Sequence, residues 1–168
     1  MSKTTIFIDA GYLIAVTLKK NKRIDLVKLS KTLAKDSWEK TIFYDALPRF
    51  GTPRYAKAQK FHSKLCKLDK FEVRLGRLQY NEHDKPTQKG VDMKLGIDLV
   101  QMSMNHDFDT AIIITGDSDF LYAVQKAKEV NVNVRLAHFP GSSINQEFLQ
   151  SFDGYDLLHD EFIDMCKL

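Results

Sequence analysis

Residues 111–120 read Ala-Ile-Ile-Ile-Thr-Gly-Asp-Ser-Asp-Phe and join the most apolar run of the chain to a short acidic turn. The apolar run, 111–115, predicts a strand buried on both faces, which places it at the centre of a sheet. Apolar residues at helical spacing over 120–130 predict a helix directly after the turn. A strand, a polar turn and a helix in this order form the repeating unit of an α/β protein, here with Asp117 and Asp119 at the carboxyl end of the strand.

The same unit recurs on both sides of this stretch. Further strands are predicted at residues 6–8, 41–44, 71–75 and 132–136, and helices at 13–18, 25–33, 53–65 and 91–102. Residues 79–89 are polar and predict an exposed loop, and Ser143 with Gln146 predicts a capping box before a last helix. Right-handed crossovers between successive strands give a mostly parallel sheet covered on both faces. The predicted fold class is therefore α/β, with three layers and a central sheet flanked by helices.

Length and composition limit the number of domains and the class of protein. The chain has 168 residues, of which 43% are hydrophobic and 28% charged, as in an ordinary globular domain. We expect one domain over residues 1–168, with 141–168 as a C-terminal extension packed on it. No apolar run is long enough to cross a membrane, and the N-terminus leads straight into a strand. The two cysteines, Cys66 and Cys166, suggest neither a disulfide framework nor a zinc site, so a cytoplasmic location is expected.

Four carboxylates follow or flank predicted strands. Asp9 ends the first strand, Asp92 lies in the first turn of the helix after the polar loop, and Asp117 and Asp119 follow the apolar run. In a parallel sheet these positions meet at one edge, where α/β proteins bind ligands. Asp92, Asp117 and Ser118 taken singly have a structural explanation as helix caps, whereas Asp9 at the end of a hydrophobic strand is less easily explained in this way. As a group the carboxylates would repel one another, and a cation that compensates this repulsion would be Mg²⁺ or Mn²⁺.

A divalent ion held by carboxylates is suited to phosphodiester hydrolysis, so a nuclease is the leading hypothesis. The chain has no GxxxxGK[ST] motif and no dinucleotide-binding glycine pattern. The segment Asp9-Ala10-Gly11 lacks a second aspartate two positions on, which argues against a phosphatase with an aspartyl nucleophile. None of the five histidines forms an HExxH pair. An acidic pocket like that of receiver domains stays open as an alternative.

Three segments resemble the NYN domain, in the LabA-like branch of the PIN-like nuclease superfamily: Phe7-Ile8-Asp9-Ala10-Gly11-Tyr12-Leu13, Lys89-Gly90-Val91-Asp92 with Leu95 and Asp98, and Thr115-Gly116-Asp117-Ser118-Asp119-Phe120. The resemblance covers roughly residues 4–140, with the segments in the family's order. It implies a PIN-like fold and a metal-dependent ribonuclease in which Asp9, Asp92, Asp117 and Asp119 hold the metal and activate water. Many relatives have Asn three positions beyond the first aspartate, where this chain has Tyr12.

Two further acids are weighed against this set. Asp98 lies six residues after Asp92, which turns it through about 240° on a helix, so we interpret it as structural. Asp45 follows the second strand and is the nearest candidate for an additional acid of the site.

Cations beside an acidic pocket would contact a polyanionic substrate. The chain supplies five of them within residues 49–64: Arg49, Arg54, Lys57, Lys60 and Lys64. The three lysines share one helical stripe, which is either a phosphate track or a solvated face. Tyr55 and Phe61 either stack on bases or face the core. Lys89 either neutralises a phosphate or tethers its loop. Thr115 and Ser118 could position water or phosphate, although Ser118 could instead simply cap the following helix.

These patterns favour Mg²⁺- or Mn²⁺-dependent cleavage of single-stranded RNA. The alternative is a non-catalytic RNA- or protein-binding regulatory module that retains the acidic metal pocket. A homodimer is a further option that no sequence feature establishes. Met102 and Met104 lie on a helix whose faces both carry apolar side chains, which packing explains without a cofactor.

Overall fold

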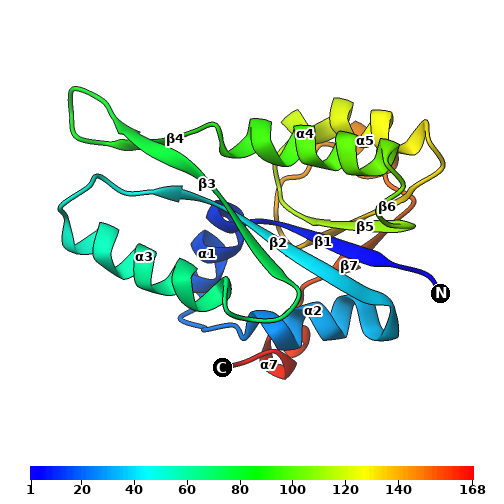
Figure 1. Ribbon diagram of the computed structural model, residues 1–168, viewed down its shortest axis with the longest axis horizontal. Helices are drawn as coiled ribbons and strands as arrows, with labels where there is room; N and C mark the ends of the chain where they lie inside the picture. Colours follow the sequence, from blue (N-terminus) through cyan, green and yellow to red (C-terminus); the bar gives the residue numbers. More distant parts are fainter.

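A seven-stranded sheet with the order β4-β3-β2-β1-β5-β6-β7 runs through the molecule between two layers of helices (Figure 1). The computed structural model describes all residues, Met1 to Leu168. The strands are β1 (Thr4–Asp9), β2 (Trp38–Leu47), β3 (Phe71–Tyr80), β4 (Pro86–Lys89), β5 (Thr110–Ile114), β6 (Asn133–His138) and β7 (Gly154–Leu157). Every neighbouring pair is parallel except β3 and β4. The predicted three-layer α/β fold with a mostly parallel sheet is confirmed.

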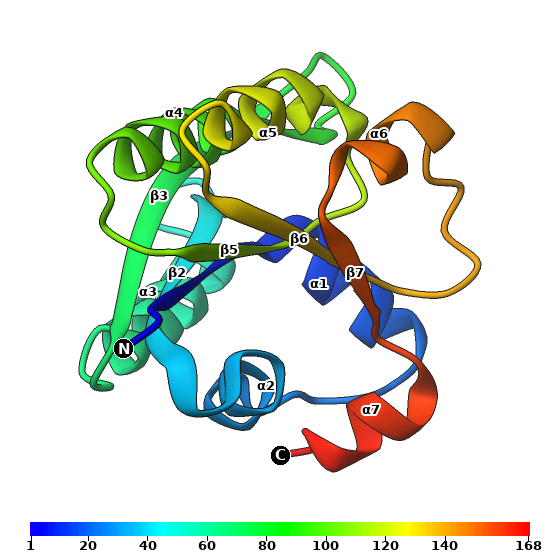
Figure 2. The same ribbon diagram turned by 90° about the vertical axis from the view of Figure 1, so that its right-hand side faces the viewer.

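The helices divide between the two faces of the sheet (Figure 2). One face is covered by α4 (Val91–Met104), α5 (Leu121–Lys128) and α6 (Gln146–Ser151). The other is covered by α1 (Ala10–Lys19), α2 (Leu26–Ala34), α3 (Pro53–Leu65) and α7 (Asp160–Met165). Two short 3₁₀ helices, η1 (Lys35–Ser37) and η2 (Ser118–Phe120), complete the elements. None of the helices has both the length and the apolar character needed to cross a lipid bilayer.

Alternation along β1 separates the two cores. Phe7 belongs to the core under α4 and α5, while Ile6 and Ile8 belong to the core under α1 and α2. All six residues of β1 are buried, because helices cover both faces of a parallel sheet. The apolar run that becomes β5 was predicted to be the central strand, but β1 holds the middle position and β5 is its direct neighbour.

The polar segment 79–89, predicted to be a loop, forms most of a hairpin instead. β3 continues to Tyr80, and β4 returns antiparallel with Tyr80 opposite Pro86 and Arg77 opposite Lys89. All four residues of β4 are exposed at the edge of the sheet, so an apolar pattern is not required there. Pro86 is tolerated because it is the first residue of an edge strand. The loop prediction was therefore wrong for all but the turn.

The C-terminal part also differs from the prediction. The side chain of Asn145, not of Ser143, caps α6, accepting hydrogen bonds from the amides of Glu147 at 2.8 Å and Phe148 at 3.2 Å. β7 then adds a parallel edge strand beside β6, and α7 follows it. The chain end is held by a bridge between Ile24 and Lys167.

Candidate functional site

Asp9 stands at the carboxyl end of the middle strand. It is the N-cap of α1, and its carboxylate accepts a long hydrogen bond of 3.4 Å from the amide of Tyr12. The Thr115 hydroxyl donates a hydrogen bond of 2.9 Å to Asp9 Oδ2 from the end of the neighbouring strand, β5. Both side chains are buried. The parallel pairing of β1 with β5 therefore fixes the orientation of Asp9.

The turn after β5 supplies two more carboxylates. Asp117 caps η2 and accepts a hydrogen bond of 2.9 Å from the amide of Asp119. The Asp117 amide in turn donates to the Thr115 hydroxyl at 3.1 Å, so Thr115 links Asp9 to this turn. Asp119 and Ser118 are exposed. Capping explains the position of Asp117 and leaves its second oxygen without a protein donor.

Asp92 enters from a third segment. The hairpin leads into α4 through Gly90, which is the N-cap with φ +80°, a conformation that glycine adopts without strain. Asp92 is thus in the first turn of α4 and is not the capping residue. The carboxylate of Asp92 accepts no hydrogen bond within the protein.

The carboxylates of the three segments lie close enough to repel one another electrostatically. Burial raises the pKa of Asp9 above its ordinary value, with a further contribution from the charges of Asp92 and Asp117. Asp92 lies at the surface, and its pKa is raised by partial desolvation and by the charges of Asp117 and Asp119. None of these four carboxylates forms an ion pair with a lysine or arginine. The structure therefore gathers negative charge here without neutralising it.

A cavity of about 500 Å³ opens beside Asp9 and Asp117. Its other lining residues are Tyr12, Gly116, Ser142 and Ser143. The Tyr12 hydroxyl accepts from the Phe139 amide at 2.9 Å and lies 3.1 Å from the Ser142 hydroxyl. A Cβ at Gly116 would lie 2.6 Å from the Tyr12 ring, so only glycine allows the acidic turn and the ring to approach this closely.

The chemistry of these residues fits a divalent cation. Carboxylate oxygens and a hydroxyl are hard donors of the kind that Mg²⁺ and Mn²⁺ prefer. A cation would also relieve the repulsion that raises the pKa values of Asp9 and Asp92. In the present side-chain positions, no three His, Cys, Asp or Glu side chains surround a common point closely enough to hold a metal ion.

Asp45 points away from this cavity. It lies on β2, one residue beyond the partner of Asp9 in the register, so its side chain faces the α3 side of the sheet. There its Oδ2 is 2.8 Å from Nε2 of His62, a buried residue of α3. The structure thus does not bring Asp45 together with the other candidate acids.

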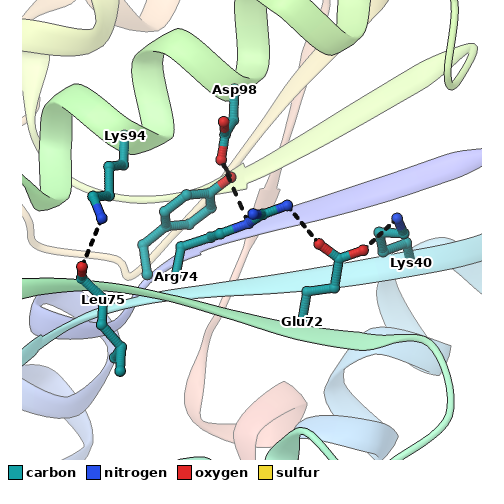
Figure 3. A network of polar contacts seen from close by, with 7 residues as sticks. Lys40, Glu72, Arg74, Leu75, Lys94 and Asp98 are labelled. Atoms are coloured by element: carbon teal, nitrogen blue, oxygen red, sulfur yellow. Dashed lines mark hydrogen bonds and ion pairs between the residues drawn. The ribbon is translucent and has the colours of Figure 1, made fainter.

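Asp98 takes part in a chain of polar contacts between α4 and the sheet (Figure 3). The buried Tyr44 hydroxyl donates to Asp98 Oδ2 at 2.9 Å, and Arg74 Nε lies 3.9 Å from the same oxygen. Arg74 also binds Glu72 at 2.7 Å, and Glu72 pairs with Lys40. Burial, reinforced by the charge of Asp98, raises the pKa of Tyr44. These contacts give Asp98 a role in attaching α4 to β2 and β3.

The predicted substrate-contacting cations are spread around the carboxyl edge. Arg49 stacks over the Tyr80 ring at 4.4 Å and pairs with Asp84 at 3.3 Å, which ties it to the hairpin. Lys89 is exposed at the end of β4, immediately before α4. Lys57 is exposed on α3, below the sheet in Figure 1. None of the three lines the cavity beside Asp9.

The two aromatic residues proposed to stack on bases have partners within the protein. Tyr55 packs edge-on against Phe50, with ring centroids 5.1 Å apart. Phe61 packs in the same way against the buried ring of Phe43 at 5.7 Å.

Three polar residues near the site were not identified as site residues from the sequence. Ser142 and Ser143 line the cavity because they follow β6, whose carboxyl end reaches the same edge. That position after a strand was the available signal. Gln88 of β4 lies over Gly11, where an added Cβ would be 2.9 Å from its amide nitrogen. No signal could have revealed Gln88, because its segment was expected to be a loop.

Comparisons with known proteins agree with this architecture. A family model described as the NYN domain matches residues 3–158. None of the curated proteins matches the chain. Among solved structures, the Vibrio parahaemolyticus protein of unknown function VPA0982 is similar, with a TM-score of 0.72 at 21% identity over 95% of this chain and 94% of that chain. A Plasmodium falciparum nicotinic acid mononucleotide adenylyltransferase matches at a TM-score of only 0.39 and 13% identity, over 95% of this chain and 75% of that chain, too weak a likeness to carry an argument.

Proposed function

The chain belongs to the NYN domain family, and we propose that it is a ribonuclease that hydrolyses phosphodiester bonds of single-stranded RNA with Mg²⁺ or Mn²⁺ as cofactor. Family membership implies a nuclease-like, RNA-related function, and NYN domains are typically ribonuclease hydrolases. The observation that carries the proposal is the group of carboxylates from three chain segments that no lysine or arginine neutralises. Within the family, the motifs resemble the LabA-like branch, to which we assign the chain.

We assign the metal to Asp9, Asp92, Asp117 and Asp119. A bound divalent cation would supply polarisation of the scissile phosphate and a more acidic water. The aspartates would orient the phosphate and the water between the ends of β1 and β5. The Thr115 hydroxyl engages Asp9 Oδ2 at 2.9 Å, so Asp9 Oδ1, with only a 3.4 Å contact, is the atom free to accept a proton from the attacking water.

The remaining predicted contacts would hold the RNA on either side of the cleaved bond. Lys89 and Arg49 belong to the hairpin region at the carboxyl edge, where they would bind flanking phosphates. Ser118 and Tyr12 lie next to the acidic residues and would contact the nucleotide at the cleavage point. Lys57 on α3 would bind phosphates farther along the strand.

Two further assignments accompany this proposal. We treat residues 1–168 as one domain, in which 141–168 contribute β7 to the shared sheet and Ser142 and Ser143 to the cavity. We place the activity in the cytoplasm, because Cys66 and Cys166 are both free thiols.

One observation favours the alternative of a non-catalytic RNA- or protein-binding module. Tyr12 stands where many relatives have Asn, and its hydroxyl is already engaged by Phe139 and Ser142. A module of this kind would keep the acidic pocket and bind a partner without cleaving it.

A titration with Mg²⁺ and Mn²⁺ separates the two functions. Metal binding should raise the Tm of the wild type, by an amount equivalent to about 2.7 kcal/mol at a hundredfold excess over Kd. The same additions should start cleavage of an end-labelled single-stranded RNA, and a matched duplex serves as the control substrate. Stabilisation by metal with no cleavage of any RNA would favour the binding module. If the metal produces neither stabilisation nor cleavage, the metal site itself is refuted.

A further inference from the structure

Helix α4 exposes a second apolar face that the fold does not cover. Its inner face carries Val91, Leu95 and Leu99, which are buried in the core. Its outer face is apolar along the whole helix, with Met93 70%, Ile97 56% and Met104 63% exposed. The residues of this outer face follow the spacing i, i+4, i+7 and i+11: Met93, Ile97, Val100 and Met104. A solvated helix normally places polar residues there, so this face is built to contact another surface.

A groove runs beside this ridge, between α4 and α5. Its volume is about 660 Å³, and its apolar lining includes Tyr122, which is 69% exposed. Small residues let the two helices approach: a Cβ at Gly96 would lie 3.7 Å from the Cβ of Ala123. We call the ridge of four residues together with this groove the α4–α5 face.

Ridge and groove suit each other in shape. Helices pack by inserting a ridge of side chains into a groove between rows on the partner. The α4–α5 face supplies both parts side by side. A two-fold axis between two copies would place the ridge of each copy in the groove of the other, which is the self-complementarity that a symmetric dimer requires.

Charge follows the same symmetry. α4 and α5 lie side by side, and both begin at the carboxyl edge of the sheet (Figure 2). Asp92 and Asp119 line the groove where the helices begin, and Lys126 lines it in the last turn of α5. A two-fold axis perpendicular to the two helices turns the partner end for end, so Lys126 of the partner subunit would face the two carboxylates. The present contact of Lys126 with Glu129, at 2.9 Å, is an exposed pair that costs little to exchange.

The same charges argue against RNA as the occupant. Only one cation lines the groove, whereas two carboxylates stand at its upper end. Binding of a phosphate backbone depends on neutralisation by several lysines or arginines.

We propose that the α4–α5 face binds a second copy of this chain to form a two-fold symmetric dimer. The proposal rests on packing and charge and does not depend on ribonuclease activity. In the dimer, the partner would cover the side of the site formed by Asp92 and Asp119 and bring its own lysine to that side.

Sedimentation analysis of the full chain tests the proposal directly. A concentration series up to about 100 μM should show a species of twice the 19.3 kDa chain mass, because an interface with a Kd near 1 μM is fully formed there. Ile97→Glu should raise the dimer Kd at least about tenfold, since it buries a charge at the centre of the ridge. Ile97 is exposed, so the Tm of this variant should equal that of the wild type at concentrations low enough to keep both proteins monomeric.

Two further variants make the test specific to this face. Leu18→Glu is the matched control, because Leu18 is a 72% exposed apolar residue of α1 on the other side of the molecule, and it should leave the dimer intact. Lys126→Glu should weaken the dimer and reverse its dependence on salt, because salt screens an attraction in the wild type and a repulsion in the variant. A wild type that stays monomeric throughout the series, or an Ile97→Glu variant as dimeric as the wild type, would overturn the proposal.

Discussion

Asp9 ends β1 and Asp45 lies two residues before the end of the adjacent parallel strand β2, yet the surroundings of the two aspartates are opposite. Asp9 pairs in register with Tyr44, so Asp45 is one residue farther along and faces the other layer of helices. Asp45 meets the buried His62 at 2.8 Å. Asp9 meets a neutral hydroxyl and two further carboxylates, and burial raises its pKa.

The partners of the two aspartates distinguish a structural acid from a candidate functional acid at this edge. A carboxylate paired with a buried imidazole, as Asp45 is with His62, stabilises the fold. A group of carboxylates without cations costs stability, and a protein retains such a cost where a cation or substrate repays it. One step in register decides between the two outcomes here.

The largest expected effect separates the two aspartates by activity. Asp117→Asn, or Asp9→Asn, should lower RNA cleavage at least about a hundredfold, because each removes a charge needed to hold the metal or accept a proton. Asparagine retains the capping function, so the fold should be intact by circular dichroism. Asp45→Asn is the matched control and should cleave RNA like the wild type. Equal losses for all three variants would abolish the distinction.

Stability should show the reverse order. Asp45→Ala leaves His62 buried with neither ring nitrogen bonded, because its Nδ1 already has no partner. We expect a loss of about 2 kcal/mol in the free energy of unfolding and a Tm lower by about 5 °C, measured by thermal denaturation. Asp9→Asn should not destabilise the protein in this way. A Tm for Asp45→Ala equal to that of the wild type would mean that the Asp45–His62 contact contributes nothing.

The pH dependence of stability should expose the cost of Asp9. The raised pKa means that between its ordinary value of 3.8 and the raised value the folded chain binds more protons than the unfolded chain. The free energy of unfolding therefore falls as the pH rises through that window. Thermal melts of Asp9→Asn should lack this part of the fall, and Mg²⁺ should offset it in the wild type alone. Parallel pH profiles for the two proteins would show that Asp9 carries no such cost.

The smallest effect is expected at Asp92. Its pKa is raised by partial desolvation and by two neighbouring carboxylates, so Asp92→Asn should raise the Tm slightly, by about 1 °C. The same variant should lose metal-dependent stabilisation in the titration. A lower Tm would show that Asp92 stabilises the fold even though its carboxylate accepts no hydrogen bond.

Much of the fold could be predicted because each buried element has a clear apolar period. The runs that became β1, β2 and β5 are buried on both faces and are consequently apolar. β4 and β7 escaped prediction for the opposite reason: they are four-residue edge strands with no fully buried residue. Their positions depend on pairing with β3 and β6, which no local pattern reveals.

The sequence could predict which edge of the sheet holds the candidate site, but not which face of the sheet each side chain points to. The expected convergence of Asp9 and Asp117 followed from the parallel order of β1 and β5, whereas Asp92 enters from the antiparallel hairpin. The orientation of Asp45 required the register between β1 and β2, although the alternation with Phe43, which faces α3, was a usable signal. The contact of Gln88 with Gly11 depended on a hairpin whose existence was not expected.

The pairing of β1 with β5 also governs when the acidic site can assemble during synthesis of the chain. Asp9 leaves the ribosome early, but the hydroxyl that orients it comes 106 residues later. Contacts so distant in sequence form late in folding. An unfinished chain therefore carries no assembled acidic centre, and the proposed ribonuclease activity would begin only after the central strands have met.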